Sequence, residues 1–287
     1  MVRMTLEGGS LRGLFTAGVL DVFMENDIEI DEIVGVSAGA LFGVNYFSNQ
    51  KGRVIRYTKK YSGDKRYMSL SSLILTGNYI NKNFAFYKVT KELDIFDNEE
   101  FKKANKKYYA VVTNIETGKP EYLKIESPVD QLEILRATSA IPLVSKIIKI
   151  NNKKYLDGGV SDSIPVYYNK DKYDKNIVIL TQPLNYKKKP LSKIKERLIK
   201  LKYHKYPNLI NIMLNRYKRY NKLLDEIKEM EEKGEIFVIR PNKNLNIKIN
   251  ETNHDKLDEI YNIGVTVAQN KIKDLKKYLE DKLWKKI

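Results

Sequence analysis

The sequence predicts an α/β fold with a mostly parallel central sheet and helices on its faces. The first fifty residues alternate strand, glycine-containing turn and helix twice, with strands at Val2–Leu6 and Ile28–Val34 and helices over about 11–25 and 38–47. This βαβα order is typical of a parallel sheet covered by helices. A chain of 287 residues is long enough to bury a hydrophobic core without covalent or metal cross-links. Its lack of cysteine excludes disulfides and thiolate metal sites.

The middle of the chain continues with shorter elements, predicted from apolar periodicity and turn residues. Helical stretches are expected between 53 and 93, with an aromatic-rich loop around Tyr79–Tyr87. After them the pattern predicts strands at Tyr108–Thr113 and Tyr122–Ile125, a helix at Gln131–Ala140, a hairpin of Ile147–Ile150 with Lys154–Leu156, and a buried strand at Ile177–Leu180.

The composition changes near 183–190, and helices are expected to dominate beyond it. Pro207 suits a helix start and Gly234 a helix end, which predicts one long helix over most of 208–233. A strand at Ile236–Ile239 and a final helix from about residue 254 follow. No internal repeat or low-complexity linker interrupts the chain, so the C-terminal part is expected to pack on the rest as a subdomain.

Positive charge is concentrated away from the N-terminus. The net charge is +16, but residues 1–50 hold seven acidic and two basic side chains, so the rest of the chain carries +21. Residues 185–222 hold thirteen Lys or Arg and one acid. Such a segment suits an anionic membrane surface or nucleic acid, although lysines that are merely solvated are the simpler interpretation. Tyrosines interleave with these lysines, but no nucleic-acid motif accompanies them, so nucleic acid is not expected as a partner.

The N-terminal region also bears on location. Met1–Leu6 lacks the long apolar core of a secretory signal, and the uncharged stretch 33–50 is interrupted by glycine, serine and asparagine. We interpret that stretch as a buried strand, turn and helix. A cytoplasmic protein is expected, with peripheral association at the membrane as an alternative.

The first motif of chemical interest is Gly35-Val36-Ser37-Ala38-Gly39, a G-x-S-x-G. A serine nucleophile requires a sharp strand-to-helix turn, which small neighbours at Gly35 and Gly39 tolerate. The helix that begins at Ala38 directs backbone N–H groups toward a developing oxyanion. A turn in which Ser37 only caps the helix is the structural alternative.

The second motif, Gly8-Gly9-Ser10-Leu11-Arg12-Gly13, lies between the first strand and its helix. Exposed glycine backbone can approach a substrate oxygen closely, and successive N–H groups form an anion nest. A phosphate-binding P-loop is excluded because Leu14 and Phe15 stand where Lys and Ser or Thr are needed. A tight turn without ligand, with Arg12 in a surface ion pair, is the alternative.

The third motif, Asp157-Gly158-Gly159, supplies a candidate base for Ser37. The chain has two histidines, His204 in a basic stretch and His254 at a polar helix entrance, and both are expected on the surface. A carboxylate must then accept the proton, and partial burial raises its pKa toward a useful range. So few histidines nearly exclude a multi-histidine metal site, and no calcium loop is present, so no cofactor is expected.

These three motifs, in this order, resemble the patatin-like phospholipase family. The family carries G-G-x-x-[RK]-G, G-x-S-x-G and D-G-[GA], and the stretch Ala137–Pro142 also resembles its A-x-S-A-x-P sequence. The resemblance covers roughly residues 1–182 and is closest to a bacterial subgroup with a helical C-terminal extension. Ser10 replaces the usual third glycine of the loop. The resemblance implies a three-layer α/β/α domain at 1–183 and a mainly helical subdomain at 184–287.

The resemblance also implies a serine lipid acyl hydrolase, of phospholipase A or lysophospholipase type, that needs no metal. In it Ser37 is the nucleophile and Asp157 the base, acting through an acyl-enzyme. The oxyanion hole is expected from the loop Gly8–Gly13, namely Gly8, Gly9, Ser10, Arg12 and Gly13, together with Ala38. Acyl transfer to another acceptor and non-catalytic binding of lipid or membrane, through segment 185–222, remain as alternatives.

Overall fold

The computed structural model describes residues 1–281, and within them eight strands form one mixed sheet. The strand order is β5-β6-β3-β2-β1-β7-β8, with β4 paired to β3. The neighbours in the run β3-β2-β1-β7-β8 pair in parallel. The pairs β3–β4, β3–β6 and β5–β6 are antiparallel. The strands are β1 (Val2–Leu6), β2 (Glu32–Val36), β3 (Lys107–Asn114), β4 (Pro120–Lys124), β5 (Ile148–Ile150), β6 (Lys153–Asp157), β7 (Lys175–Ile179) and β8 (Phe237–Ile239).

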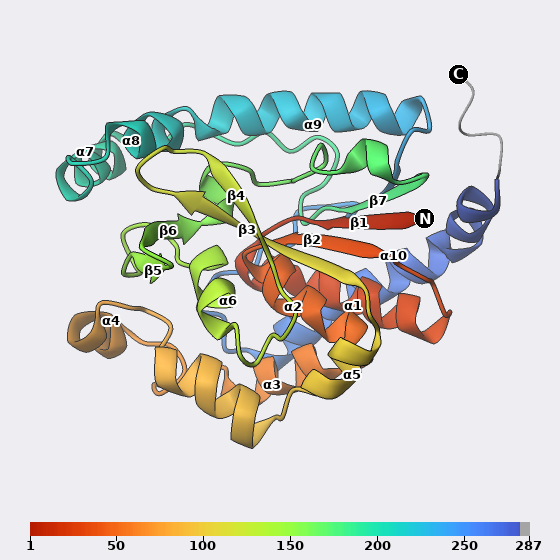
Figure 1. Ribbon diagram of the computed structural model, residues 1–287, viewed down its shortest axis with the longest axis horizontal. Helices are drawn as coiled ribbons and strands as arrows, with labels where there is room; N and C mark the ends of the chain where they lie inside the picture. Colours follow the sequence, from red (N-terminus) through yellow and green to blue (C-terminus); the bar gives the residue numbers. More distant parts are fainter. Residues whose placement is uncertain (282–287) are drawn as a thin grey trace.

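Helices cover both faces of this sheet, which confirms the predicted three-layer α/β/α fold. Helices α1, α2 and α10 lie on one side and α9 on the other (Figure 1). The longer helices are α1 (Gly13–Glu25), α2 (Ala38–Phe47), α3 (Arg53–Tyr61), α4 (Leu70–Thr76), η2 (Lys82–Leu93), α5 (Asn98–Lys103), α6 (Leu132–Thr138), α7 (Lys193–Lys202), α8 (Pro207–Leu214), α9 (Arg216–Glu232) and α10 (His254–Glu280). Short 3-10 turns are η1 (Ser10–Arg12), η3 (Gly158–Val160) and η4 (Lys170–Lys172).

The apolar strands fill two cores because their side chains alternate between the faces of the sheet. In β7, Ile177 and Ile179 join the core formed with α1, α2 and α10. Val178 and the following Leu180 join the second core, under α9. A strand that is buried on both faces of a sheet has a continuous run of apolar residues. The run Ile177–Leu180 therefore predicted β7 as a buried strand.

Helix α10 belongs to the main core. It crosses α1 where two glycines allow the backbones to touch: a Cβ added at Gly18 would lie 2.2 Å from the Tyr261 carbonyl oxygen, and one at Gly264 would lie 2.1 Å from that of Phe15. Strand β8 also extends the sheet beyond β7. Residues 184–281 therefore share the sheet and core with the N-terminal part. The predicted boundary at 183 stays a prediction, and residues 282–287 of the predicted subdomain lie outside the described residues.

Two predicted elements were wrong in detail. The single long helix over 208–233 is two helices, α8 and α9, which meet at Asn215 with φ −95° and ψ 4°. The Asn215 amide donates back to the Asn211 carbonyl at 3.1 Å, a local bond of the kind with which asparagine competes against a continuous helix. The aromatic region around Tyr79–Tyr87 is largely the helix η2, with π-type hydrogen bonding and an N-terminal cap from Asn81.

Candidate active site

Ser37 stands at the turn between β2 and α2. Its backbone has φ 52° and ψ −123°, a conformation that L-residues rarely adopt. Gly35 permits the turn, since a Cβ there would lie 2.7 Å from the Ala40 Cα. The Ser37 side chain is only partly buried at the carboxyl end of β2. This is the geometry expected of a nucleophile elbow, in which a strained backbone presents the hydroxyl.

Asp157, at the end of β6, is the hydrogen-bond partner of this serine. The Ser37 hydroxyl donates to Asp157 Oδ2 at 2.7 Å, across 120 residues of sequence. The second carboxylate oxygen, Oδ1, accepts the Gly159 N–H at 2.7 Å. The Asp157 backbone is fixed on both sides, by its N–H to Ala140 O at 3.0 Å and by its carbonyl, which accepts from Thr113 Oγ1 at 2.8 Å. The two predicted residues are therefore in direct contact.

Burial sets the electrostatics of Asp157, which is 8% exposed. Desolvation raises the pKa of its carboxyl above the ordinary value, and the hydrogen bond from Ser37, the charge of Arg216 and the Gly159 N–H oppose that rise. A carboxylate with a raised pKa is a stronger base than a free aspartate. The environment thus favours proton transfer from the serine.

The loop of residues 8–13 passes directly beside Ser37. A Cβ added at Gly8 would lie 3.1 Å from the Ser37 Cβ, so only glycine allows this approach. Ser10 adopts φ 52°, in the left-handed region that favours glycine. Among the described residues, the backbone N–H groups of Gly9, Ser10 and Ala38 have no hydrogen-bond acceptor. They are available to a ligand oxygen.

The glycines of the three motifs lie in tight surroundings, where an added Cβ would come within 3.0 Å of another atom. The nearest atoms are backbone atoms at Gly35, Gly39 and Gly158 and side-chain atoms at Gly9, Gly13 and Gly159. Arg12 ends η1, and its N–H donates to the Gly9 carbonyl at 3.1 Å, which closes the loop. Its side-chain Nε is buried without a hydrogen-bond partner in the described residues. The surface ion pair considered for Arg12 is absent from the part of the chain that the structure describes.

Thr138 is a site residue that the sequence did not single out. It is fully buried, and its Oγ1 accepts the Ser37 N–H at 2.9 Å while donating to the Val111 carbonyl at 2.6 Å. It therefore fixes the strained turn to the neighbouring strand β3. Thr138 lies inside the stretch Ala137–Pro142, whose resemblance to the family sequence predicts no role for it.

The C-terminal part also reaches the site. The Arg216 guanidinium, on the first residue of α9, donates to Ser163 Oγ at 3.2 Å and lies 3.1 Å from the position of a Cβ at Gly159. Farther along α9, the Tyr220 hydroxyl donates to the buried Glu7 carboxylate, whose other oxygen accepts the Thr181 N–H at 2.6 Å. Glu7 directly precedes the glycine-rich loop. No local sequence signal distinguishes Arg216 from the many cations around it.

The two histidines are remote from this chemistry. His204 is exposed after α7 and shares a hydrogen bond with the Leu201 carbonyl, and His254 is exposed at the first turn of α10. Both expectations of surface histidines are met. Among residues 1–281, no group of three or more His, Asp or Glu side chains is arranged to hold a metal ion.

An apolar cavity of about 80 Å³ lies between α2, η2 and α6. Leu41 and Phe42 line it from the helix that follows Ser37, and Phe86 and Leu135 line it from the other two. Neither Ser37 nor Asp157 contributes to its wall, so we assign no acyl site to it.

The fold and the site define a class of α/β/α proteins in which a serine on a strained turn contacts a buried aspartate. Residues 4–169 match the family model described as patatin-like phospholipase, and this match covers more than half of the chain. The chain belongs to the patatin-like phospholipase family, which confirms the resemblance carried by its motifs. Residues 206–280 match a second model, described as a domain of unknown function (DUF6363).

Two curated proteins are similar to part of the chain. One is "Uncharacterized protein YjjU" of Escherichia coli (strain K12), 29% identical over 175 residues, or 58% of this chain and 47% of that protein. The other is "Probable lipid hydrolase 463L" of Invertebrate iridescent virus 6, 28% identical over 189 residues, or 58% of this chain and 64% of that protein. The alignments thus span less than two thirds of either relative.

Among solved structures, VipD from Legionella pneumophila is similar with a TM-score of 0.47 and 12% identity, over 95% of this chain and 66% of that one. In the described part of the present chain, no helix combines the length and the apolar character needed to cross a membrane.

Proposed function

We propose that this protein is a serine lipid acyl hydrolase, of phospholipase A or lysophospholipase type, that uses a Ser37–Asp157 dyad. The observation that carries the proposal is the 2.7 Å hydrogen bond from the hydroxyl of a strained, partly exposed serine to a buried carboxylate with a raised pKa. Family membership and the name of the viral relative support lipid as the substrate.

In the acylation step, Ser37 Oγ forms a bond to the ester carbonyl carbon while its proton passes to Asp157 Oδ2. The negative charge that develops on the carbonyl oxygen is stabilised by the free N–H groups of Gly9, Ser10 and Ala38, with Arg12 adding positive charge nearby. Collapse of the tetrahedral intermediate breaks the bond to the alcohol, which leaves with the proton held by Asp157.

In the deacylation step, Asp157 accepts a proton from a water molecule as its oxygen attacks the acyl-enzyme carbonyl. The same N–H groups stabilise the second tetrahedral intermediate. When it collapses, the bond to Ser37 breaks and the serine regains the proton from Asp157. The products are the free fatty acid and the unmodified dyad.

Labelling with a fluorophosphonate probe, followed by peptide mapping, tests the identity of the nucleophile. We expect the label on Ser37 and none on the Ser37→Ala variant. Ser37→Ala and Asp157→Asn should each lower hydrolysis of a short-chain p-nitrophenyl ester by at least about a thousandfold. Ser62→Ala, which changes a serine outside the site, is the matched control and should keep full activity. Full activity in either dyad variant would falsify the mechanism.

Product analysis separates hydrolysis from acyl transfer, since both use the same dyad. With a phospholipid substrate and an added alcohol or thiol, hydrolysis predicts free fatty acid as the main product. A predominance of the ester or thioester of the acceptor would instead identify an acyltransferase and overturn the hydrolase assignment.

Contact of segment 185–222 with an anionic membrane is part of the same proposal. The segment is not uniform: Arg216 turns toward the dyad, and Lys188 is partly buried with its ammonium 4.5 Å from the ring centroid of Tyr220. Burial lowers the pKa of Lys188 to about 8. Among the exposed cations of this segment that form no ion pair within residues 1–281, most belong to α7, so membrane contact is best sought there.

A further inference from the structure

Helix α4 buries a polar side chain and exposes its large apolar ones. The residue that it buries is Ser72, 5% exposed, whose hydroxyl donates to the Asn78 carbonyl at 2.8 Å. Its apolar side chains point outward, with Leu70 69%, Ile74 83% and Leu75 84% exposed. A surface helix normally buries its apolar stripe. Three adjacent large apolar side chains held in water therefore indicate a face that is covered in use.

Helix α7 presents a second apolar stripe. Ile194, Leu198 and Leu201 are 72%, 48% and 75% exposed, at the i, i+4 and i+7 spacing that places them on one face. The only side chain that α7 buries, among the described residues, is Ile199. Half of the exposed large hydrophobic residues found in the described chain thus lie on two short helices.

The two helices belong to one surface, joined by the segment 141–146. The Leu143 N–H donates to the hydroxyl of Tyr203, directly after α7, at 3.0 Å, and the Lys202 ammonium donates to the Leu143 carbonyl at 3.2 Å. On the other side, the Tyr79 N–H donates to the Val144 carbonyl at 2.9 Å, just after α4. Both helices lie at the same end of the molecule (Figure 1).

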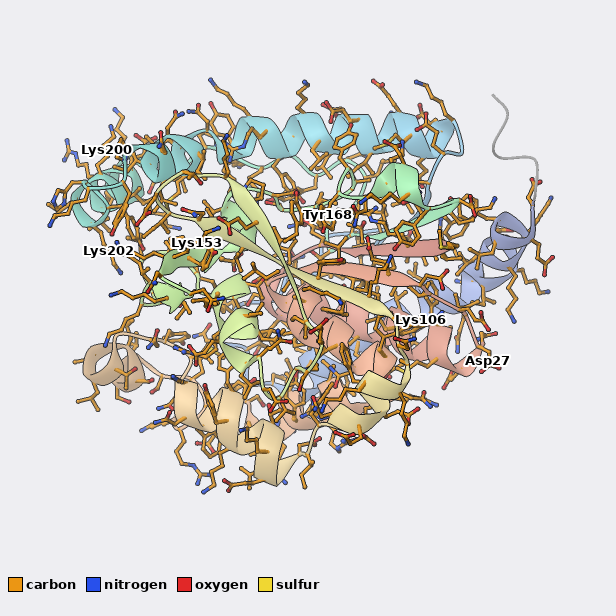
Figure 2. All side chains as sticks on the ribbon, in the orientation of Figure 1. Asp27, Lys106, Lys153, Tyr168, Lys200 and Lys202 are labelled. Carbon is orange, nitrogen blue, oxygen red and sulfur yellow. The ribbon has the colours of Figure 1, made fainter. Side chains whose placement is uncertain are left out.

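This surface is strongly basic. Helix α7 carries five cations and one acid between Lys193 and Lys202. None of Lys193, Lys195, Arg197 and Lys200 forms an ion pair within residues 1–281. Figure 2 shows Lys200 and Lys202 at this end of the molecule. Unpaired cations beside outward leucines and isoleucines match the two parts of an anionic lipid surface, its headgroups and its acyl chains.

The surface is also connected to the candidate active site. Segment 141–146 follows Ala140, whose carbonyl accepts the Asp157 N–H at 3.0 Å. Strand β1 starts at the marked N-terminus and its carboxyl end, where the glycine-rich loop begins, points toward the side on which α4 and α7 lie (Figure 1). A bilayer on this surface would therefore lie on the side toward which the carboxyl ends of β1 and its parallel neighbour β2 point, and Ser37 directly follows β2.

We propose that the exposed apolar faces of α4 and α7, with the cations of α7, form a docking surface for an anionic phospholipid bilayer. Leu70, Ile74 and Leu75 on one helix and Ile194, Leu198 and Leu201 on the other enter the boundary between headgroups and acyl chains. The choice of lipid as the occupant rests on the proposed function. The surface itself extends beyond the basic segment, because α4 lies more than a hundred residues before it.

Sedimentation with vesicles tests the proposal independently of catalysis, in a Ser37→Ala background that leaves the lipid intact. The protein should bind vesicles of equal phosphatidylcholine and phosphatidylglycerol much more strongly than vesicles of phosphatidylcholine alone, and salt should weaken binding. The double variants Ile74→Ser with Leu75→Ser and Leu198→Ser with Leu201→Ser should each lower the partition coefficient by at least about tenfold, because each removes two side chains from the acyl boundary.

The matched control is Ile95→Ser, which removes a side chain of 64% exposure between η2 and α5 and should leave binding unchanged. With Ser37 intact, all variants should hydrolyse a soluble ester at the parent rate, which separates loss of docking from loss of the site. Unchanged binding in both double variants would overturn the proposal. So would gel filtration showing that the parent chain is a dimer which the same variants convert to monomer, since a second copy would then cover the surface.

Discussion

The strained backbone at Ser37 leads to a prediction about stability. With φ 52° and ψ −123°, the residue occupies a region that is open to glycine but costly for any side chain with a Cβ. Two substitutions separate the backbone from the hydroxyl. Ser37→Ala removes the hydroxyl and keeps the strain, whereas Ser37→Gly removes both. Their difference in stability therefore reports the strain.

The expected magnitude follows from two opposing contributions. Relief of the unfavourable dihedral angles stabilises the folded Gly variant by roughly 1–3 kcal/mol. The greater freedom of glycine in the unfolded chain destabilises it by about 0.4–1 kcal/mol. The Gly variant should therefore exceed the Ala variant by about 1 kcal/mol in the free energy of unfolding.

Urea denaturation followed by circular dichroism measures this difference, with both variants at the same pH and ionic strength. Equal m-values are required so that the midpoints report stability. Both variants should be inactive toward esters, because neither carries the nucleophile. A Gly variant that is less stable than the Ala variant would refute the argument that the turn is strained.

Further predictions concern the partners of Ser37. Burial raises the folded-state pKa of Asp157, so its charged form costs stability at neutral pH. Asp157→Asn should therefore melt at a higher temperature near pH 7, and this gain should fade as the pH falls through the raised pKa and be absent below about 4, where the carboxyl is protonated in both states. The charge of Arg216 lowers the pKa of Asp157, so Arg216→Gln should move the acidic limb of the pH profile of kcat/KM to higher pH. The control Lys218→Gln should leave the limb in place. An unmoved limb in Arg216→Gln would contradict the effect of Arg216 on Asp157. Thr138→Val leaves the Ser37 N–H without its acceptor, so it should lower the free energy of unfolding by about 1–3 kcal/mol and also lower kcat. Thr138→Ser keeps the hydroxyl and should retain the parent stability and kcat.

Much of the fold could be predicted because its strands are long apolar runs bounded by turns. The strand Val2–Leu6 has the predicted bounds, and the final helix starts at the predicted residue, His254. The prediction of one helix over 208–233 was wrong because a local hydrogen bond sets the break. The Asn215 side chain donates to the carbonyl of Asn211 in the preceding turn, and nothing in the apolar pattern indicates that the helix ends there. Helical stretches are predicted between 53 and 93, but the part around Tyr79–Tyr87 is predicted as a loop, because the π-type hydrogen bonding of η2 does not produce the apolar period of an α-helix.

The candidate dyad could be predicted because both residues lie in short motifs with a geometric purpose. Ser37 needs a small-residue turn and Asp157 a glycine that donates to its carboxylate, and each leaves a mark in the adjacent sequence. Thr138 and Arg216 leave none. Each acts across a long sequence separation through a single contact, and threonine and arginine are common enough that their positions alone signal nothing.

The same contacts bear on how the chain is divided. The three motifs lie within the segment that matches the patatin-like model, yet the buried Glu7 beside the glycine-rich loop is held by Tyr220, and Arg216 adds its charge to the surroundings of Asp157. Both Arg216 and Tyr220 belong to α9, and β8, which follows α9 in the chain, extends the sheet next to β7. A chain that ended near 183 would expose Glu7 and one face of the sheet. The electrostatics of the dyad are therefore a property of both parts of the chain together.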